Sequence, residues 1–328
     1  MRLLMLGGTE FVGRAVVEEA LGRGWDVTVF HRGRHPSPEC VAALHGDRTE
    51  AGGLAALESG EWDAVVDTWS GAPSAVAAAA RLLDGRVGHH TYVSSRSVYA
   101  YPAAAGADED GPVVEGSPED DDATDYARAK RGGELAAEAV FGDRALSARA
   151  GLIIGPYENI GRLPWWLDRI AMGGRVLAPG PRDLPLQYVD VRDLAAWILD
   201  AAQSGLGGPY NLVSPPGHTT MGALLEACAA ATDSGAELCW TDPRRILDAG
   251  VRPWTDLPIW LPRGESHDTL HRGDASRALA TGLRCRPVAE TVADTWSWLR
   301  ALGGEPPRRA DRPAVGLDPA VEAELLAA

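Results

Sequence analysis

Near its start the chain reads Leu3-Leu4-Met5-Leu6-Gly7-Gly8-Thr9-Glu10-Phe11-Val12-Gly13. The apolar run at 3–6 predicts a buried strand, and residues 10–23 have the apolar spacing of a helix. A strand, a glycine turn and a helix in this order direct backbone N–H groups and the helix dipole toward a pyrophosphate. The stretch therefore predicts a dinucleotide-binding unit.

Glu10 departs from the usual glycine pattern of such a turn. It stands where a third glycine, spaced Gly-x-x-Gly-x-x-Gly, would let the backbone approach the phosphates. A carboxylate at this place is unfavourable unless it points away or pairs with a cation such as Arg14.

The chain continues as short apolar runs that alternate with helical patterns. Strands are expected at 27–30, 64–67, 90–94, 146–154, 187–191 and 210–213, and helices at 72–83 and 194–202. This alternation predicts an α/β fold, a Rossmann-type doubly wound parallel sheet with a smaller mixed α/β substrate-binding domain. We expect residues 1–155 plus 186–213 to form the dinucleotide-binding domain, residues 156–185 plus 214–302 the substrate domain, and residues 303–328 a C-terminal tail with a short helix at 319–327.

Two stretches are expected to be loops. Residues 103–125 are acidic and rich in glycine and proline, which predicts a solvated loop, with Thr124 or Asp125 as the N-cap of the next helix. Residues 251–262 contain three prolines, which exclude a regular helix or central strand. That loop either covers the core or lines a pocket.

Composition narrows the class of protein. The 328 residues carry a net charge of −15, which argues against nucleic acid or an anionic membrane as the main partner. The sequence contains no run of 18 apolar residues, so it predicts no membrane-spanning helix. The short apolar N-terminus is interpreted as a strand and not as a signal peptide. Four scattered cysteines without a CxxC pair predict no metal site and fit a cytoplasmic protein.

Lys130 is the one lysine among 31 lysine and arginine residues, and Tyr126 lies four positions before it. On a helix, positions i and i+4 share a face, so a phenol and a compact ammonium would lie side by side. Because an ammonium favours the phenolate form of its neighbour, the pair is a candidate general acid and base for a carbonyl or alcohol.

The stretch after the second strand bears on cofactor choice. It carries His31, Arg32 and Arg34 where sites that prefer NAD place an acid for the ribose hydroxyl. Arginines would clamp a 2′-phosphate, so we predict a preference for NADP(H), with NAD(H) as the alternative. Asp47, in Gly46-Asp47-Arg48, is placed to accept from the adenine amino group.

Several motifs together resemble the extended short-chain dehydrogenase/reductase superfamily, in its NAD-dependent epimerase/dehydratase group. They are the glycine turn, Gly46-Asp47-Arg48, Val93-Ser94-Ser95-Arg96-Ser97-Val98-Tyr99, Tyr126-x-x-x-Lys130, Arg149-Ala150-Gly151 with Gly155-Pro156, and Tyr188-Val189-Asp190-Val191-Arg192-Asp193-Leu194. The Gly-Gly-Thr-x-Phe-Val-Gly fingerprint is similar to that of a reductase-like branch.

The resemblance implies a catalytic set of Ser95, Tyr126 and Lys130, with Ser94 as the rival for the serine role. It implies cofactor contacts from Gly7, Thr9, Glu10, Phe11, Val12, Gly13, Arg32, Asp47, Arg48, Thr68, Tyr126 and Lys130. Trp69, Arg96, Tyr99, Trp165 and Gln187 are substrate candidates. A homodimer is common in the family.

Three functions remain open. The first is an NADP(H)-dependent oxidoreductase that acts on a small carbonyl or alcohol. The second is a nucleotide-sugar epimerase that retains NAD, and the third is a non-catalytic cofactor-sensing or RNA-associated protein. Sugar-nucleotide dehydratases of the family follow their catalytic threonine with Asp-Glu, whereas this chain has Arg96-Ser97, so dehydration is not expected.

Overall fold

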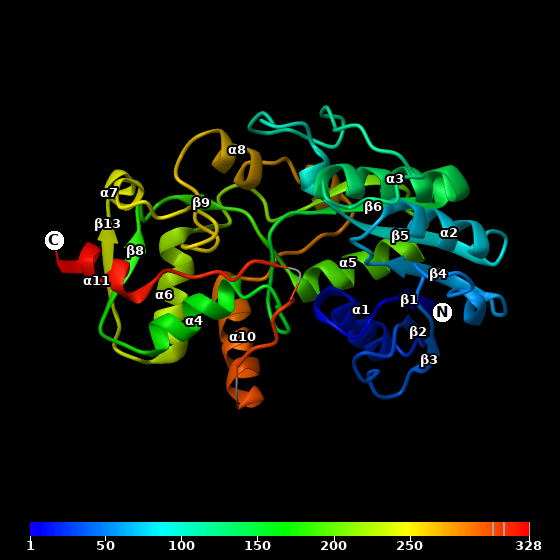
Figure 1. Ribbon diagram of the computed structural model, residues 1–328, viewed down its shortest axis with the longest axis horizontal. Coiled ribbons are helices and arrows are strands. Elements are labelled where there is room, and N and C mark those ends of the chain that lie inside the picture. The colour runs from blue at the N-terminus through cyan, green and yellow to red at the C-terminus, as the bar shows by residue number, and fades with distance from the viewer. Residues whose placement is uncertain (304, 311, 328) are drawn as a thin grey trace.

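The computed structural model describes residues 1–303, 305–310 and 312–327. Its centre is a sheet of seven strands in the order β11-β6-β5-β4-β1-β2-β3, and every pair of neighbours is parallel (Figure 1). The order 3-2-1-4-5-6 is that of the Rossmann fold, here extended by β11. This confirms the predicted fold class.

Except for β3, the sheet strands lie close to the expected ranges. They are β1 (Arg2–Leu6), β2 (Asp26–His31), β3 (Ala42–His45), β4 (Trp62–Asp67), β5 (Val87–Ser95), β6 (Ala145–Ala150) and β11 (Gly208–Leu212). One expected strand, at 146–154, is instead two. The chain bends after β6 at Gly151, where a Cβ would lie 2.3 Å from Val213, and β7 (Ile153–Ile154) then pairs with β10 (Val189–Asp190).

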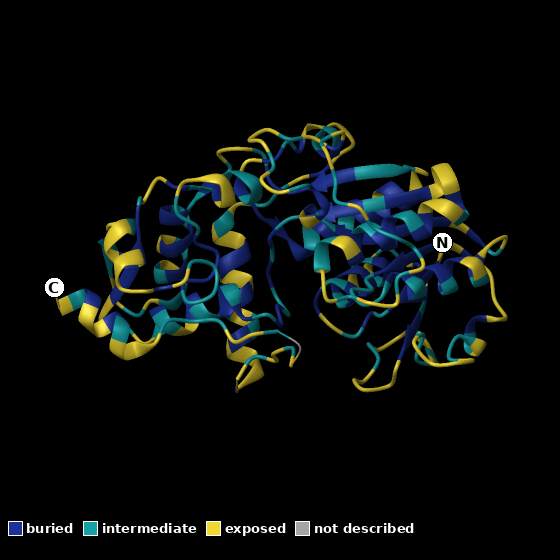
Figure 2. Ribbon diagram, turned by 45° about the horizontal axis from the view of Figure 1, so that its top comes forward, coloured by how far each residue is buried: buried dark blue, intermediate teal, exposed yellow. Residues whose placement is uncertain are grey.

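Helices cover both faces of the sheet. On one face α1 (Phe11–Gly22) packs against α5 (Val191–Gln203), and on the other α2 (Pro73–Leu83) packs against α3 (Tyr126–Phe141). Helix α5 begins three residues earlier than expected, because Asp190 caps it. The strands between these layers are buried, and the outward faces of the helices are exposed (Figure 2). Short 3₁₀ turns η1 (Ala55–Leu57), η2 (Arg96–Val98) and η3 (Gly142–Arg144) follow strands or helices of this lobe.

A second lobe has its own apolar core, which includes Trp166, Trp260 and Leu325. It is built from the strand pairs β8 (Arg175–Pro179) with β13 (Glu237–Thr241) and β9 (Pro185–Leu186) with β12 (Thr219–Thr220). Its helices are α4 (Arg162–Ala171), α6 (Met221–Thr232), α7 (Pro243–Asp248), α8 (Glu265–His271) and α10 (Val288–Leu302). Helix α9 (Ser276–Ala280) instead packs near β11 of the sheet. The exact domain boundaries stay a prediction.

The C-terminal tail belongs to this packing. It leaves α10, passes the junction of the lobes and ends in α11 (Pro319–Ala327) beside β8 (Figure 1). Glu322 of α11 accepts hydrogen bonds from Arg169 Nε at 2.7 Å and from the backbone N of Leu177 at 3.0 Å. The tail is therefore anchored by buried polar contacts as well as by Leu325.

The two expected loops contain no helix or strand among the described residues, but the acidic one is not solvated throughout. Glu109 is only 6% exposed, because its carboxylate accepts a hydrogen bond from the backbone N of Asn211 at 2.7 Å and lies 3.5 Å from Arg277. Composition does not distinguish this residue from its acidic neighbours at 108 and 110.

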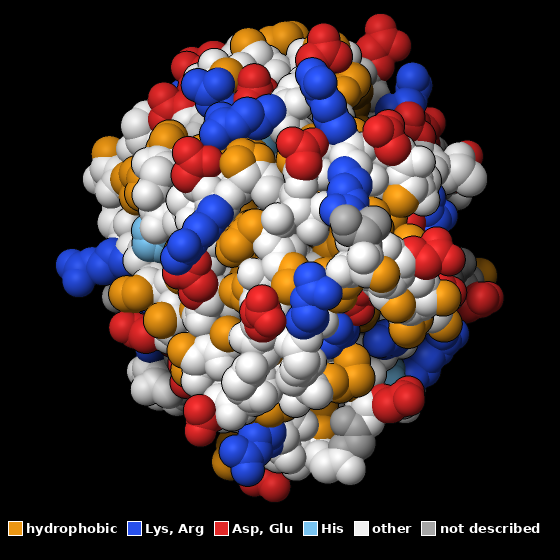
Figure 3. Space-filling view, turned by 90° about the vertical axis from the view of Figure 1, so that its left-hand side faces the viewer, with side chains coloured by type: hydrophobic (Ala, Val, Ile, Leu, Met, Phe, Trp, Pro, Cys, Tyr) orange, Lys and Arg blue, Asp and Glu red, His pale blue; other side chains and the backbone are white. Residues whose placement is uncertain are grey.

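Charges of both signs are interspersed on the end of the molecule that carries α11 (Figure 3). Among the described residues, no helix has the length and apolar character needed to cross a bilayer.

Candidate active site

The turn after β1 has the shape that a dinucleotide needs. Gly7 and Gly8 have φ angles of 117° and 96°, a region that favours glycine. Helix α1 begins at Phe11, so its first N–H groups, which have no partner within the helix, are directed toward the turn. A Cβ on Gly13 would lie 2.6 Å from the backbone N of Gly8, so only glycine lets the helix start this close. The pyrophosphate of a dinucleotide therefore fits this turn.

Glu10 is held to one side of the turn. Its Oε1 accepts a hydrogen bond from Asn159 Nδ2 at 3.3 Å and lies 3.8 Å from His35 Nε2. Arg14, the cation considered for this role, pairs with Glu18 at 2.8 Å instead. The carboxylate therefore has partners outside the glycine turn.

A pocket of about 330 Å³ lies beside the turn. The turn forms one side, and α10 with the tail forms the other; its lining includes Thr9, Glu10, Phe11, Trp298, Leu302 and Pro307. Its lining does not include Tyr126 or Lys130, so it flanks the dinucleotide turn and not the proton-transfer pair.

Arg32 and Arg34 are exposed after β2 and lie near Asp47. Hydrogen bonds from the hydroxyl and backbone N of Thr49, at 2.7 and 3.1 Å, lower the pKa of the Asp47 carboxyl, and the two arginines add to this. The structure thus brings together the acid and the cations predicted for the adenosine end of a cofactor.

Thr68 directly follows β4, and Arg48 follows β3, so both lie at the edge of the sheet where the strands end. The Thr68 hydroxyl is 2.7 Å from the place of a Cβ on Gly7, so it touches the turn. Arg48 donates to Asp67 Oδ2 at 2.8 Å in a buried pair, and its guanidinium lies 5.0 Å from the centre of the Trp69 ring. Arg48 is therefore committed to the protein interior, and the expected cofactor contact from it stays a prediction.

Helix α3 begins at Tyr126. Of the two N-cap candidates, the structure has Asp125, whose Oδ1 accepts from the backbone N of Ala127 at 3.0 Å and of Arg128 at 3.1 Å. The cap fixes the first turn of the helix and thereby the half-buried Tyr126 side chain at the edge of the sheet.

Lys130 is 4% exposed and points into the site. Its Nζ donates to the backbone carbonyls of Trp69 and Val93, each at 2.7 Å, and lies 6.0 Å from the centre of the Tyr126 ring. Burial lowers its pKa to about 7. Asp67 opposes this shift, and the positive charge of Arg309 adds to it.

Glycine explains how α3 comes so close to the sheet. A Cβ on Gly133 would lie 2.5 Å from the Tyr92 ring, and one on Gly132 would lie 2.6 Å from Pro73 of α2. Gly133 lets the helix pack tightly on β5, which brings the Lys130 ammonium within reach of the Val93 carbonyl, and Gly132 lets it pack closely on α2.

The two candidate serines at the end of β5 point in opposite directions. Ser94 is 3% exposed and donates to Glu134 Oε1 at 2.7 Å, within a buried network that includes Arg149. Ser95 is partly exposed; its hydroxyl donates to Ser97 Oγ at 3.1 Å and accepts from the Ser97 backbone N. This alternation along the strand favours Ser95 for substrate contact.

Three of the five substrate candidates lie in the interior. Gln187 is fully buried, and its amide bonds to Ser214 and Gly273. Tyr99 donates to Asn211 Oδ1 at 2.8 Å. Arg96 donates to the carbonyls of residues 269 and 270 in α8. These three side chains are buried and hydrogen-bonded within the protein, except that the Nε of Arg96 has no hydrogen-bond partner, so their contact with a substrate stays a prediction.

The other two candidates are tryptophans that remain partly exposed. The Trp69 indole N donates to the Ala72 carbonyl at 2.9 Å, and the Trp69 backbone carbonyl holds Lys130. Trp165 lies edge-on to Trp166, and Gly316 of the tail packs against it. Trp69 is thus next to the catalytic candidates, whereas Trp165 contacts the tail.

Arginine side chains near Tyr126 were missed by the sequence analysis. Arg162, at the start of α4, lies 4.8 Å from the Trp254 ring and interacts electrostatically with Tyr126. Glu158 accepts from the backbone N of Arg162 at 2.7 Å, and burial raises its pKa to about 7. Arg312, from the tail, lies 5.2 Å from the centre of the Tyr126 ring. No sequence motif marks these positions.

A family model described as the NAD dependent epimerase/dehydratase family matches residues 3–212. The chain belongs to this family. A search of curated proteins finds no match.

Several solved structures share the fold. A candidate epimerase of Burkholderia cenocepacia J2315 is 22% identical, with a TM-score of 0.70, over 92% of this chain and 98% of that one. UDP-glucose 4-epimerase of Thermus thermophilus, in complex with NAD, is 21% identical, with a TM-score of 0.64, over 92% and 99%. Bordetella bronchiseptica WbmG, in complex with NAD and UDP, is 17% identical, with a TM-score of 0.67, over 95% and 99%.

This family membership, together with the Rossmann sheet, identifies the chain as an enzyme of the extended short-chain dehydrogenase/reductase type. The matched region ends at the last residue of β11, so the family model spans the dinucleotide lobe with α4, β8 and β9 of the second lobe and does not cover α6, α10 or the tail.

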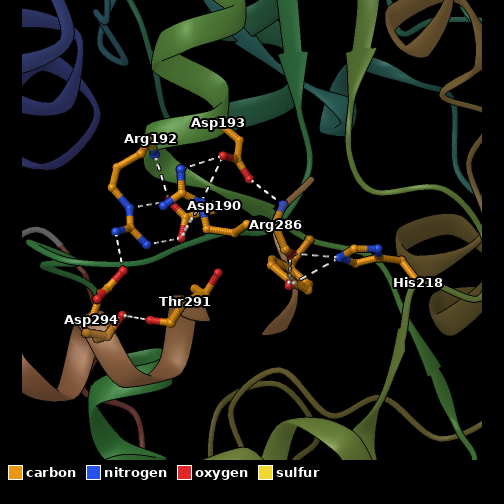
Figure 4. A network of polar contacts seen from close by, with 9 residues as sticks. Asp190, Arg192, Asp193, His218, Arg286, Thr291 and Asp294 are labelled. Carbon is orange, nitrogen blue, oxygen red and sulfur yellow. Dashed lines mark hydrogen bonds and ion pairs between the residues drawn. The ribbon is translucent and has the colours of Figure 1, made fainter. Parts of the chain in front are cut away.

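The motif at 188–194, which the chain shares with the epimerase/dehydratase family, links its two lobes. Buried Asp190 pairs with Arg192 at 2.8 Å, and Asp193 pairs with Arg286 at 2.7 Å (Figure 4). Arg192 also donates to Asp294 of α10 at 2.5 Å. The network connects the first turn of α5 to the segment that leads into α10, and so fixes the second lobe relative to the sheet.

Proposed function

We propose that the enzyme is an epimerase of a nucleotide-linked sugar that works on a retained nicotinamide dinucleotide. The observation that carries the proposal is the hydrogen bond from Lys130, one helical turn after Tyr126, to the carbonyl of Val93, two residues before Ser95, in a chain of the epimerase/dehydratase family with a dinucleotide turn. This reverses the order of the two leading hypotheses from the sequence, in which an NADP(H)-dependent reductase came first.

The glycine turn and Thr68 would hold the cofactor, with Asp47 and Arg32 at its adenosine end. When bound, a nicotinamide dinucleotide supplies hydride acceptance and return. Dehydration is not favoured, because Arg96 is buried and bonded to carbonyls near α8.

The side chains of this chain handle the proton. The partly exposed Ser95 hydroxyl would hydrogen-bond the reacting oxygen of the sugar. The Tyr126 hydroxyl would remove the proton from that oxygen and later return it. Lys130 is held by two carbonyls, so its position is fixed while its positive charge favours the phenolate form of Tyr126.

The test begins with the cofactor. The purified enzyme is denatured, and the released nucleotide is identified by chromatography; we expect NAD at close to one equivalent per chain. The enzyme is then incubated with UDP-glucose and other nucleotide sugars, and products are followed by NMR. Epimerised product without net change in reduced nicotinamide is expected.

A second candidate, the NADP(H)-dependent oxidoreductase, is favoured by Arg32 and Arg34 beside Asp47. Stoichiometric NADPH consumption with a carbonyl substrate, and loss of the preference for NADPH in Arg32→Ala, would establish this candidate and overturn the epimerase proposal. Equal affinities for NADH and NADPH, unchanged in Arg32→Ala, would rule out the NADP(H)-dependent candidate.

A further inference from the structure

The C-terminal tail is attached to both sides of the active site. The backbone N of Arg309 donates to the carbonyl of Asn159 at 2.9 Å, and Asn159 in turn bonds Glu10 of the dinucleotide turn. Further along, the backbone N of Gly316 donates to the carbonyl of Thr255 at 2.9 Å. The described residues between these anchors, 310 and 312–315, are therefore held at the junction of the lobes.

Between the anchors, the tail brings positive charge to the proton-transfer pair. The guanidinium of Arg312 lies 5.2 Å from the centre of the Tyr126 ring, within the range of a cation–π contact. Arg309 and Arg312 both lie near enough to Lys130 to destabilise its ammonium.

The remaining groups around Lys130 define its electrostatic setting. Asp67, at the end of β4, and Glu134, on α3, favour its ammonium, and the Tyr92 ring of β5 lies 4.7 Å from Nζ. Burial and the two tail arginines act in the opposite direction. The charge at Lys130 is thus a balance to which the sheet, α3 and the tail all contribute.

We propose that the C-terminal tail is part of the active site: Arg312 is a positioning residue that holds the Tyr126 ring, and Arg309 and Arg312 supply positive charge beside Lys130. A cation over the ring restricts the orientation of the phenol and favours its ionised form. The inference builds on the proposed role of Tyr126 and Lys130, but it concerns residues outside the region that the family model matches.

The test uses the fact that Lys130 is the only lysine in the chain. Lysine labelled with ¹³C at the ε-carbon gives a single side-chain NMR signal, whose pH titration reports the pKa of Lys130 without substrate. The wild type is expected to titrate at a pKa of about 7. Arg309→Gln, Arg312→Gln and the double variant each remove positive charge near Lys130, so the midpoint of the Lys130 titration should rise. In the double variant the rise should be at least about half a pH unit.

Arg308→Gln is the matched control. It removes the same charge from the same tail, but Arg308 is exposed and interacts with Asp168 of α4 instead of Lys130. Its Lys130 midpoint should equal that of the wild type. An unchanged midpoint in the Arg309 and Arg312 variants, or an equal rise in Arg308→Gln, overturns the proposal.

A second readout tests the positioning of Tyr126. With a nucleotide-sugar substrate, Arg312→Gln should lower kcat by about tenfold or more and shift its pH profile, with a smaller change in KM. A loss confined to thermal stability, with kcat and its pH profile unchanged, also overturns the proposal. If the enzyme is not an epimerase, the NMR titration still decides the role of the tail, so the two failures can be distinguished.

Discussion

At the scale of single residues, the active site depends on two side chains of one helix. Tyr126 and Lys130 are separated by one turn of α3, yet they have different surroundings: the phenol is half-buried at the sheet edge, and the ammonium is buried against two carbonyls. This difference fits a division of labour in which Tyr126 exchanges a proton with substrate while Lys130 stays fixed.

Tyr126→Phe tests the first half of this division. Removal of one hydroxyl from a half-buried ring should leave the free energy of unfolding nearly unchanged, while kcat falls by about 10²–10⁴-fold. Steady-state kinetics and urea denaturation measure the two quantities. Tyr101→Phe is the control, because Tyr101 is 63% exposed and its hydroxyl bonds Ser266. Similar losses of kcat in both variants would argue against a proton-transfer role.

Lys130 makes stability depend on pH in a predictable direction. Its pKa falls from the ordinary 10.5 to about 7 on folding, so between these values the unfolded chain binds more protons than the folded one. The free energy of unfolding contributed by this group therefore rises as the pH rises from 7 toward 10.5, and no further above that value.

In Lys130→Met this contribution disappears. The free energy of unfolding is measured by urea denaturation at pH 7 and at a pH about 2 units higher. The difference in this quantity, wild type minus variant, should become more positive at the higher pH, because only the wild type gains stability from the neutral amine. Arg128→Met, at an exposed position of the same helix, is the control and should follow the wild type. Identical pH dependence in Lys130→Met and the wild type would show that burial does not lower the pKa of Lys130.

At the scale of elements, the close packing of α3 on β5 sets the position of Lys130. Sequence periodicity predicted the strands and helices of the sheet, because their apolar faces are continuous. It did not predict the break at Gly151 or the early start of α5. The break depends on close contact with Val213, which is distant in sequence, and the start of α5 depends on the cap from Asp190, which the periodicity assigned to a strand.

Gly133→Ala tests this packing. The added methyl would meet the Tyr92 ring at 2.5 Å, so α3 must shift or the ring must move, at a cost of about 1–3 kcal/mol. Because Lys130 moves with the helix, kcat should fall as well. The free energy of unfolding by urea and steady-state kinetics give both effects.

Gly22→Ala is the matched control, as a Cβ there meets no atom within 4 Å. Glycine is a poor helix former, so this variant should be neutral or more stable by up to about 1 kcal/mol. If Gly133→Ala behaves in the same way, α3 is not constrained by Tyr92.

At the scale of the whole molecule, the sequence located the dinucleotide lobe and the catalytic candidates but not their surroundings. The resemblance indicated Ser95, Tyr126 and Lys130, and the packing of α3 on β5 brings the Lys130 ammonium to the carbonyl of Val93, two residues before Ser95. Arg162 and Arg312 were not found, because they approach Tyr126 only when the second lobe and the tail are packed. Tyr99 and Gln187 were expected at the substrate because the sequence does not show that their side chains are buried.

The lobes are held together by the ionic network around Arg286, and this gives the final prediction. In Arg286→Met, the carboxylate of Asp193, whose side chain is 10% exposed, loses its partner, and buried Asp190 keeps only Arg192 (Figure 4). Because an uncompensated buried charge is unfavourable, the free energy of unfolding should fall by about 2–3 kcal/mol, as measured by urea denaturation. Arg252→Met removes an exposed pair with Asp256 and should cost less than about 1 kcal/mol. If the two variants lose equal stability, the network does not fix the second lobe, and the junction to which the tail is attached must be held by apolar contacts instead.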